Sequence, residues 1–181
     1  MSSYYYLVSQ LPNISGLGEK SALPITPDEF KSLCSRFLDG NSRNVVMGLS
    51  LVPPEQQTRT GSPFLDAWYG HERNLRLALA QIRAQKMRKD FYQLPGSCTA
   101  DILQCARTAV GMSSPLAAEQ FLFDYRMKVL DDLRPLDGFS IDAVYEYGVR
   151  LLLVSRMKKF DTENGRNSYH RIYDTILGES L

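Results

Sequence analysis

Two histidines, His71 and His170, are the side chains of this sequence best suited to acid–base chemistry near neutral pH. They stand far apart, neither has a second ligand at metal-binding spacing, and no G-x-S-x-G nucleophile motif occurs. We interpret His71, beside Glu72, as a helix-surface residue. The adjacent pair Asp131 and Asp132 does not place two carboxylates on one helix face. The sequence therefore predicts no catalytic residue, no metal, no cofactor and no enzymatic activity.

A glycine-rich stretch from Ser15 to Ser21, SGLGEKS, is similar to the end of a phosphate-binding loop. That motif requires a lysine directly after its last glycine, but here Glu19 separates Gly18 from Lys20. Neither a leading strand nor an immediately following helix is indicated, so we interpret the stretch as a linker.

The most prominent charged feature is the segment HERNLRLALAQIRAQKMRKD, which concentrates six cations within seventeen positions: Arg73, Arg76, Arg83, Lys86, Arg88 and Lys89. One interpretation is a docking face for an acidic partner or for phosphates, with Arg73, Arg76, Arg83 and Lys86 as candidate binding residues. The other is a solvated helix face whose C-terminal cations suit the helix dipole. Binding of single-stranded nucleic acid is less favoured, because aromatic residues are not interleaved with these cations.

Glu72 stands in the apolar row of the same predicted helix, where an unpaired carboxylate would be costly. We therefore expect it to pair with an arginine. Arg76, one helical turn further on, is the nearest candidate. Arg150 or Arg156 would instead join two helices through an ion pair.

Three consecutive tyrosines, Tyr4, Tyr5 and Tyr6, open the chain. Tyrosine buries apolar ring area while its hydroxyl stays in contact with water. We expect this segment to attach the N-terminus to the helical body, and any exposed ring to be a candidate partner contact.

Start and stop signals divide the chain into helices. Thr26 and Glu29 form a predicted capping box, and Ser114 and Ser140 are predicted caps. The expected helices cover 27–39, 43–51, 63–89, 99–110, 115–133, 140–159 and 162–178, the last with Tyr169, Ile172, Tyr173 and Ile176 inward.

The predicted fold is mainly α, a compact multi-helix bundle of about six to seven helices, with an extended or helical N-terminal segment packed on it. We expect a single helical domain, 1–181, made of an N-terminal segment and helical hairpin (1–52), a loop (53–63) and a main helical body (64–181).

Composition limits the function classes. The 181 residues include 21 basic and 20 acidic side chains, so no whole-molecule field favours nucleic acid or an anionic membrane. No signal peptide or membrane-spanning run is indicated. The three cysteines, Cys34, Cys98 and Cys105, lack CxxC spacing and suit reduced thiols in a cytoplasmic protein.

Three stretches carry a family resemblance: YYYLVSQLP at the start, ERNLRLALAQIRAQK in the middle and RMKKFDTENGRNSYHRIYDTILGE near the end. Together they resemble a bacterial family whose genes lie among those for V-type ATPase/ATP synthase subunits. The middle stretch is also similar to an acidic-x-x-Asn-Leu…Arg-x-x-Lys pattern of the C-type subunit of V/A-type ATPases, which is called d in eukaryotes. That pattern falls here on Glu72, Asn74, Leu75, Arg83 and Lys86.

This resemblance implies a mechanical role without catalysis. The C-type subunit is an all-helical socket that joins the central stalk of the rotor to the membrane ring, without a nucleotide or metal site. The resemblance thus implies central-stalk or membrane-ring subunits as partners, and a cytoplasmic location peripheral to the inner face of the membrane through those partners. A helical adaptor with an unrelated protein partner is the alternative.

Overall fold

A computed structural model of the chain describes residues 4–14, 22–55, 59–89, 98–160 and 162–178. The phosphate-loop-like stretch 15–21 lies outside the described residues. Over the described ranges the chain forms eight helices and no strand: α1 (Tyr5–Gln10), α2 (Pro27–Phe37), α3 (Gly40–Met47), α4 (Pro63–Lys86), α5 (Ala100–Gly111), α6 (Pro115–Asp132), α7 (Ile141–Met157) and α8 (Thr162–Gly178). The predicted mainly α class is confirmed.

Helix starts follow the predicted capping chemistry. The Thr26 hydroxyl accepts a hydrogen bond from the Glu29 amide, and the Glu29 carboxylate accepts one from the Thr26 amide at 2.8 Å. The hydroxyls of Ser62, Ser114 and Ser140 cap α4, α6 and α7 by accepting a hydrogen bond from an amide of the first turn, without the reciprocal bond. Because these side chains satisfy amides that have no partner inside the helix, they fix where each element begins.

The second short helix begins earlier than its prediction of 43–51. Asp39 accepts a hydrogen bond from the Ser42 amide at 2.8 Å and caps α3, so the helix starts at Gly40. Gly40, expected to end the preceding element, is instead the first residue of α3. At the other end, the amide of Gly48 closes the helix against Asn44.

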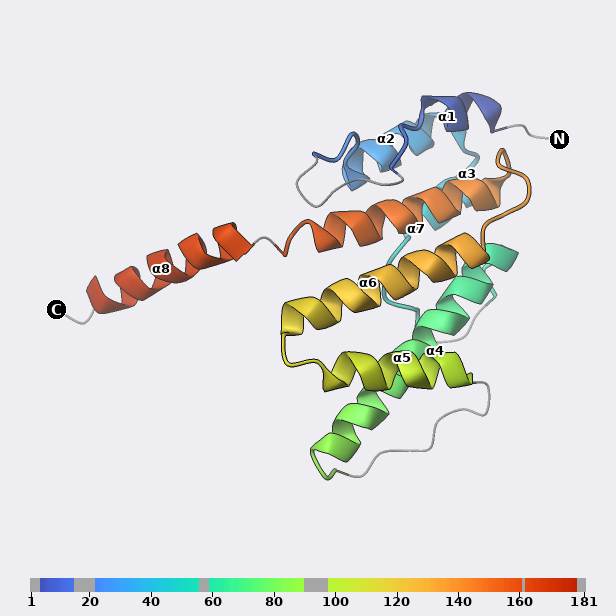
Figure 1. Cartoon of the computed structure of the whole chain (residues 1–181). Coiled ribbons are helices and arrows are strands. Elements are labelled where there is room, and N and C mark those ends of the chain that lie inside the picture. The colour runs from blue at the N-terminus through green and yellow to red at the C-terminus, as the bar shows by residue number, and fades with distance from the viewer. Residues whose placement is uncertain (1–3, 15–21, 56–58, 90–97, 161, 179–181) are drawn as a thin grey trace.

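The arrangement is centred on α7, which packs against α2, α3, α4 and α6 (Figure 1). Helix α1 lies on α2 along one side of the body, and α5 lies on α4 and α6 along the other. The predicted attachment of the N-terminal segment takes the form of α1, whose Leu7 is fully buried.

The buried apolar residues form two clusters that both use α4. The larger one includes Trp68 on α4 and the inner face of α7, and the smaller one includes Leu75 on α4 and the inner face of α5. Gly148 allows α7 to approach closely, because a Cβ there would lie 2.7 Å from Leu49 and 2.9 Å from Phe30. Helix α4 therefore contributes to both clusters, with Trp68 in one and Leu75 in the other.

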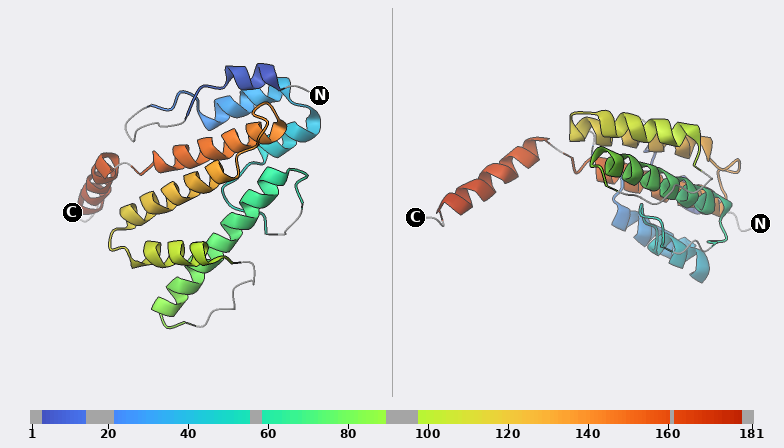
Figure 2. Two further views of the ribbon diagram at one scale, coloured as in Figure 1. Left: turned by 45° about the vertical axis from the view of Figure 1, so that its right-hand side comes forward. Right: turned by 90° about the horizontal axis from the view of Figure 1, so that it is seen from below.

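Helix α8 departs from its prediction. It extends away from the other helices (Figures 1 and 2), and the residues expected to face inward are at least half exposed: Tyr169, Ile172, Tyr173 and Ile176. Helical spacing identifies an apolar face but carries no information about whether this chain supplies its cover. Of the helices described, none has the length and apolarity needed to cross a bilayer.

Candidate functional site

The polar centre of the molecule is Glu72, which lies on α4 between the two apolar clusters with only 1% of its surface exposed. Arg126 of α6 binds it in a bidentate manner, with Nε to Oε2 at 2.8 Å and Nη2 to Oε1 at 2.9 Å. Arg76 adds a third bond, Nε to Oε1 at 2.7 Å. The predicted pair of Glu72 with Arg76 is confirmed, and the partner across helices is Arg126.

Arg126 was not among the arginines expected to bind Glu72, although the sequence contains a signal for it. It stands in the same row of α6 as Phe123 and Leu130, as Glu72 stands in the apolar row of α4. Two charged residues of opposite sign that each stand in an apolar row, here Glu72 and Arg126, indicate a buried ion pair.

The other two arginines proposed for Glu72 pair elsewhere. Arg150 of α7 binds Asp131 at 2.7 Å and Glu146 at 2.6 Å, and Arg156 binds Glu119 of α6 at 2.8 Å. Both Arg150 and Arg156 therefore tie α7 to α6, the kind of connection expected of them, but through different carboxylates.

His71 is half-buried rather than a helix-surface residue, because its ring lies against Tyr125 with centroids 5.6 Å apart. Its Nε2 is buried and has no hydrogen-bond partner among the described residues. Burial lowers the pKa of His71, and the nearby carboxylates of Asp101 and Glu72 oppose that effect only in part. The imidazole is thus held neutral at physiological pH.

Asp101 and the thiols of Cys98 and Cys105 complete this region. The Tyr125 hydroxyl donates to Asp101 Oδ2 at 2.9 Å, and hydrogen bonding from Thr99 is the main cause that lowers the pKa of Asp101. Burial raises the pKa of Cys105 to about 11, so its thiol stays protonated at neutral pH. At neutral pH the region therefore presents a neutral imidazole and a protonated thiol. Among the described residues, no group of three or more potential ligands could hold a metal ion.

Three of the four candidate cations of α4 bind backbone carbonyls of this chain. Arg73 donates to Pro54 at 2.7 Å, Arg76 to Leu51 at 3.1 Å, and Lys86 to Val110 at 3.2 Å. Arg83 is exposed and makes no such bond within the described part of the chain. Arg73 and Arg76 therefore attach the 51–54 loop to α4. The cations of the basic segment that are available to a partner lie toward the C-terminal end of the helix.

The three N-terminal tyrosines occupy different environments. Tyr4 is partly buried against the larger apolar cluster, whereas Tyr5 and Tyr6 are 53% and 71% exposed. The Tyr5 ring contacts Phe139, in the turn between α6 and α7, with centroids 5.0 Å apart. The exposed rings are thus gathered where the N-terminus meets that turn.

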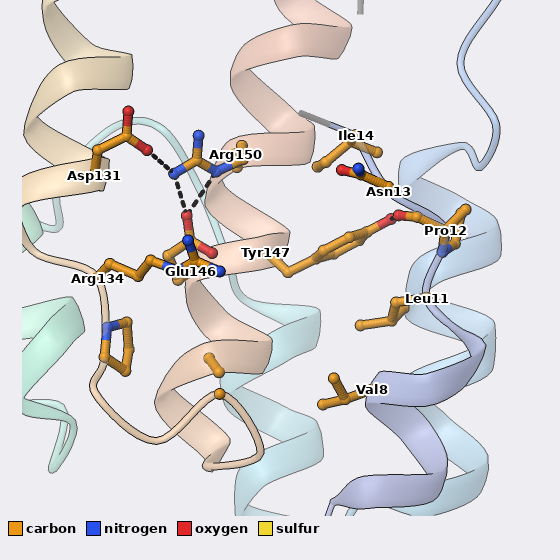
Figure 3. A pocket seen from close by; sticks show the side chains of 13 residues that line it. Val8, Leu11, Pro12, Asn13, Ile14, Asp131, Arg134, Glu146, Tyr147 and Arg150 are labelled. Carbon is orange, nitrogen blue, oxygen red and sulfur yellow. Dashed lines mark hydrogen bonds and ion pairs between the residues drawn. The ribbon is translucent and has the colours of Figure 1, made fainter. Parts of the chain in front are cut away.

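Next to this point is a groove of about 260 Å³, between the N-terminal segment and the α6–α7 corner (Figure 3). Val8, Leu11 and Ile14 line its apolar side, and the Arg150 ion pairs lie across from them. The Tyr147 hydroxyl donates to the Pro12 carbonyl at 2.8 Å and joins the two sides. Sequence reasoning missed this groove because its walls come from segments more than a hundred residues apart.

The chain matches no protein-family model, no curated protein and no solved structure. We therefore infer a function for this chain from the surfaces described above.

Proposed function

We propose that the protein is a non-catalytic accessory or C-subunit-like structural component of a V-type ATP synthase, docking to central-stalk or membrane-ring subunits. The observation that carries a docking role is α8, which extends from the body with an uncovered apolar face. Tyr169, Ile172, Tyr173 and Ile176 follow the i, i+3, i+4, i+7 spacing by which helices bind partner grooves.

The choice of partner rests on the resemblance carried by the N-terminal, middle and C-terminal stretches. The C-terminal stretch includes all of α8, so one of the three stretches that are similar to the ATP synthase-linked family is also the part left uncovered. A helical adaptor with an unrelated protein partner is the alternative, and α8 would serve it equally well.

Co-purification tests the proposal. The natively expressed protein is tagged, membranes are isolated gently, and the recovered proteins are identified by mass spectrometry. We expect stoichiometric recovery of stalk or ring subunits, and loss of that recovery in Ile172→Asp. Asn167→Asp, on the opposite side of α8, is the matched control and should keep it. Stoichiometric recovery of an unrelated protein would favour the adaptor, and a solitary protein would reject both.

The basic helix is tested separately. Arg83→Glu reverses an exposed cation of α4, and Arg107→Glu reverses an exposed cation of α5 as a control. If the end of α4 faces an acidic partner surface, Arg83→Glu should slow association more than Arg107→Glu does, because local charge acts mainly on the association rate. Equal rates would remove α4 from the interface. Salt-sensitive binding of single-stranded nucleic acid to the wild type would favour the nucleic-acid alternative.

A further inference from the structure

A second surface lies at the corner where the N-terminal segment meets the α6–α7 turn. Its exposed apolar residues are Tyr5, Tyr6, Leu136 and Phe139, and Leu136 is fully exposed. Apolar side chains gathered in this way, beside a groove, mark interaction sites more often than scattered ones do. We name this patch, together with the adjoining groove, the corner surface.

The charged side chains that line the groove balance one another, Asp131 and Glu146 against Arg134 and Arg150. The negative excess of the corner surface comes from its rim, where exposed Asp132 and Asp137 are adjacent in sequence to the lining residues Asp131 and Gly138. Asp142, the remaining acidic residue between 131 and 150, instead accepts a hydrogen bond from Ser62 at the start of α4, and residues 4–14 opposite carry no charge. One of the two cations, Arg150, is buried and already bound to Asp131 and Glu146. Arg134 is therefore the only exposed cation among the described residues of this stretch, against exposed Asp131, Asp132 and Asp137.

The groove is suited to a side chain rather than to a cofactor. Its volume, about 260 Å³, lies below the roughly 300–1,000 Å³ of typical small-molecule sites. Val8, Leu11 and Ile14 provide an apolar wall, and the ion pairs opposite are already satisfied by one another (Figure 3). An apolar group entering the groove would meet that wall without leaving a buried charge unpaired.

We propose that the corner surface binds a basic segment of a partner protein, which inserts one large aliphatic or aromatic side chain into the groove. The negative rim selects the positive charge of the segment, and the groove and its exposed rings select the apolar side chain. This surface does not involve α8, so the inference stands or falls independently of the ATP synthase assignment.

The test is a selection from a random peptide library displayed on phage, with the full chain as the target. We expect the selected peptides to be positively charged and to share one large apolar residue. In fluorescence anisotropy their affinity should fall by about tenfold or more when that residue is changed to alanine, and should also fall with added salt.

Variants locate the binding site on the protein. Asp132→Lys reverses an exposed charge next to the groove-lining Asp131, and Asp124→Lys reverses an exposed charge elsewhere on α6 as the control. Gly138→Leu narrows the groove at a position where a Cβ would meet no atom within 4 Å, so the fold should tolerate it. Asp132→Lys and Gly138→Leu should weaken the selected peptides about tenfold while Asp124→Lys does not. Selection of acidic peptides, no selection at all, or equal binding to all variants would overturn the proposal.

Discussion

The carboxylate of Glu72, in the middle of α4, is bound by the guanidinium groups of Arg76 and Arg126, which differ in burial. Arg126 is almost fully buried, whereas the side chain of Arg76 is 41% exposed. Water can replace Arg76 in part, whereas Arg126 is buried from water together with Glu72. The two arginines therefore differ in their effect on stability although both contact the same residue.

We expect Arg126→Met to lower the free energy of unfolding by about 3–5 kcal/mol, because it leaves the buried Glu72 charge without its main partner. Arg76→Ala removes a partly exposed ion pair and should cost about 1 kcal/mol or less. Urea denaturation of both variants measures the difference. The double variant Glu72→Met/Arg126→Met should recover much of the loss, and equal costs for the two single variants would contradict this account of the network.

His71 should make stability depend on pH below neutrality. Its folded-state pKa lies below the ordinary value of 6.5, because burial disfavours the charged imidazole. The unfolded chain then binds more protons than the folded one, so stability is complete above pH 6.5 and decreases as the pH falls toward the folded-state pKa. His71→Phe, which keeps a ring against Tyr125, should make the urea midpoints depend less on pH below 6.5. An unchanged slope would assign the dependence to other groups.

At the scale of the elements, α4 and α7 each contain an internal glycine whose surroundings differ. Gly148 of α7 faces Leu49 and Phe30 at distances too short for a Cβ, whereas a Cβ at Gly70 of α4 would meet nothing within 4 Å. The first glycine permits packing between helices, and the second only loosens its own helix.

The substitution to alanine should therefore have opposite effects at the two positions. Gly70→Ala should stabilise the protein by about 0.5–1 kcal/mol, from helix propensity alone. Gly148→Ala gains the same propensity but forces Phe30 and Leu49 to move, an overpacking cost of about 1–3 kcal/mol, so we expect net destabilisation. Thermal or urea unfolding of both variants provides the comparison, and a stabilising Gly148→Ala would show that α2 can shift without cost.

Helix positions were predictable from the sequence where capping residues determine them. The caps at Thr26, Ser114 and Ser140 act through neighbours within four residues, so they can be read locally. The start of α3 was misplaced because Gly40 was interpreted as a stop signal, whereas Asp39 makes it a start.

The candidate sites depend on contacts across the chain. The pairing of Glu72 with Arg126 joins residues more than fifty positions apart, and only the fold decides which arginine reaches the carboxylate. The corner surface likewise needs residue 5 beside residue 139. The amphipathic spacing of α8 predicts an apolar face, but whether that face is covered depends on contacts outside the helix.

The whole molecule consists of two unequal parts. Helices α1 to α7 form a body that shares the two apolar clusters, whereas no described residue of α8 belongs to either cluster. The body is fastened by the apolar clusters and by ion pairs that link α4, α6 and α7. Helix α8 has no comparable support, since its large apolar side chains are at least half exposed. Most helical stability in proteins comes from packing of the apolar face, which α8 lacks here.

Hydrogen exchange should therefore separate the two parts. In the isolated protein we expect amides of α8 to exchange at least about a hundredfold faster than those of α7, because opening α8 breaks few tertiary contacts. Adding the partner identified by co-purification should protect α8 selectively, and Ile172→Asp should prevent that protection while Asn167→Asp does not. If the α8 amides of the isolated protein were protected as strongly as those of α7, its apolar face would already be covered, and a docking role for that face would have to be abandoned.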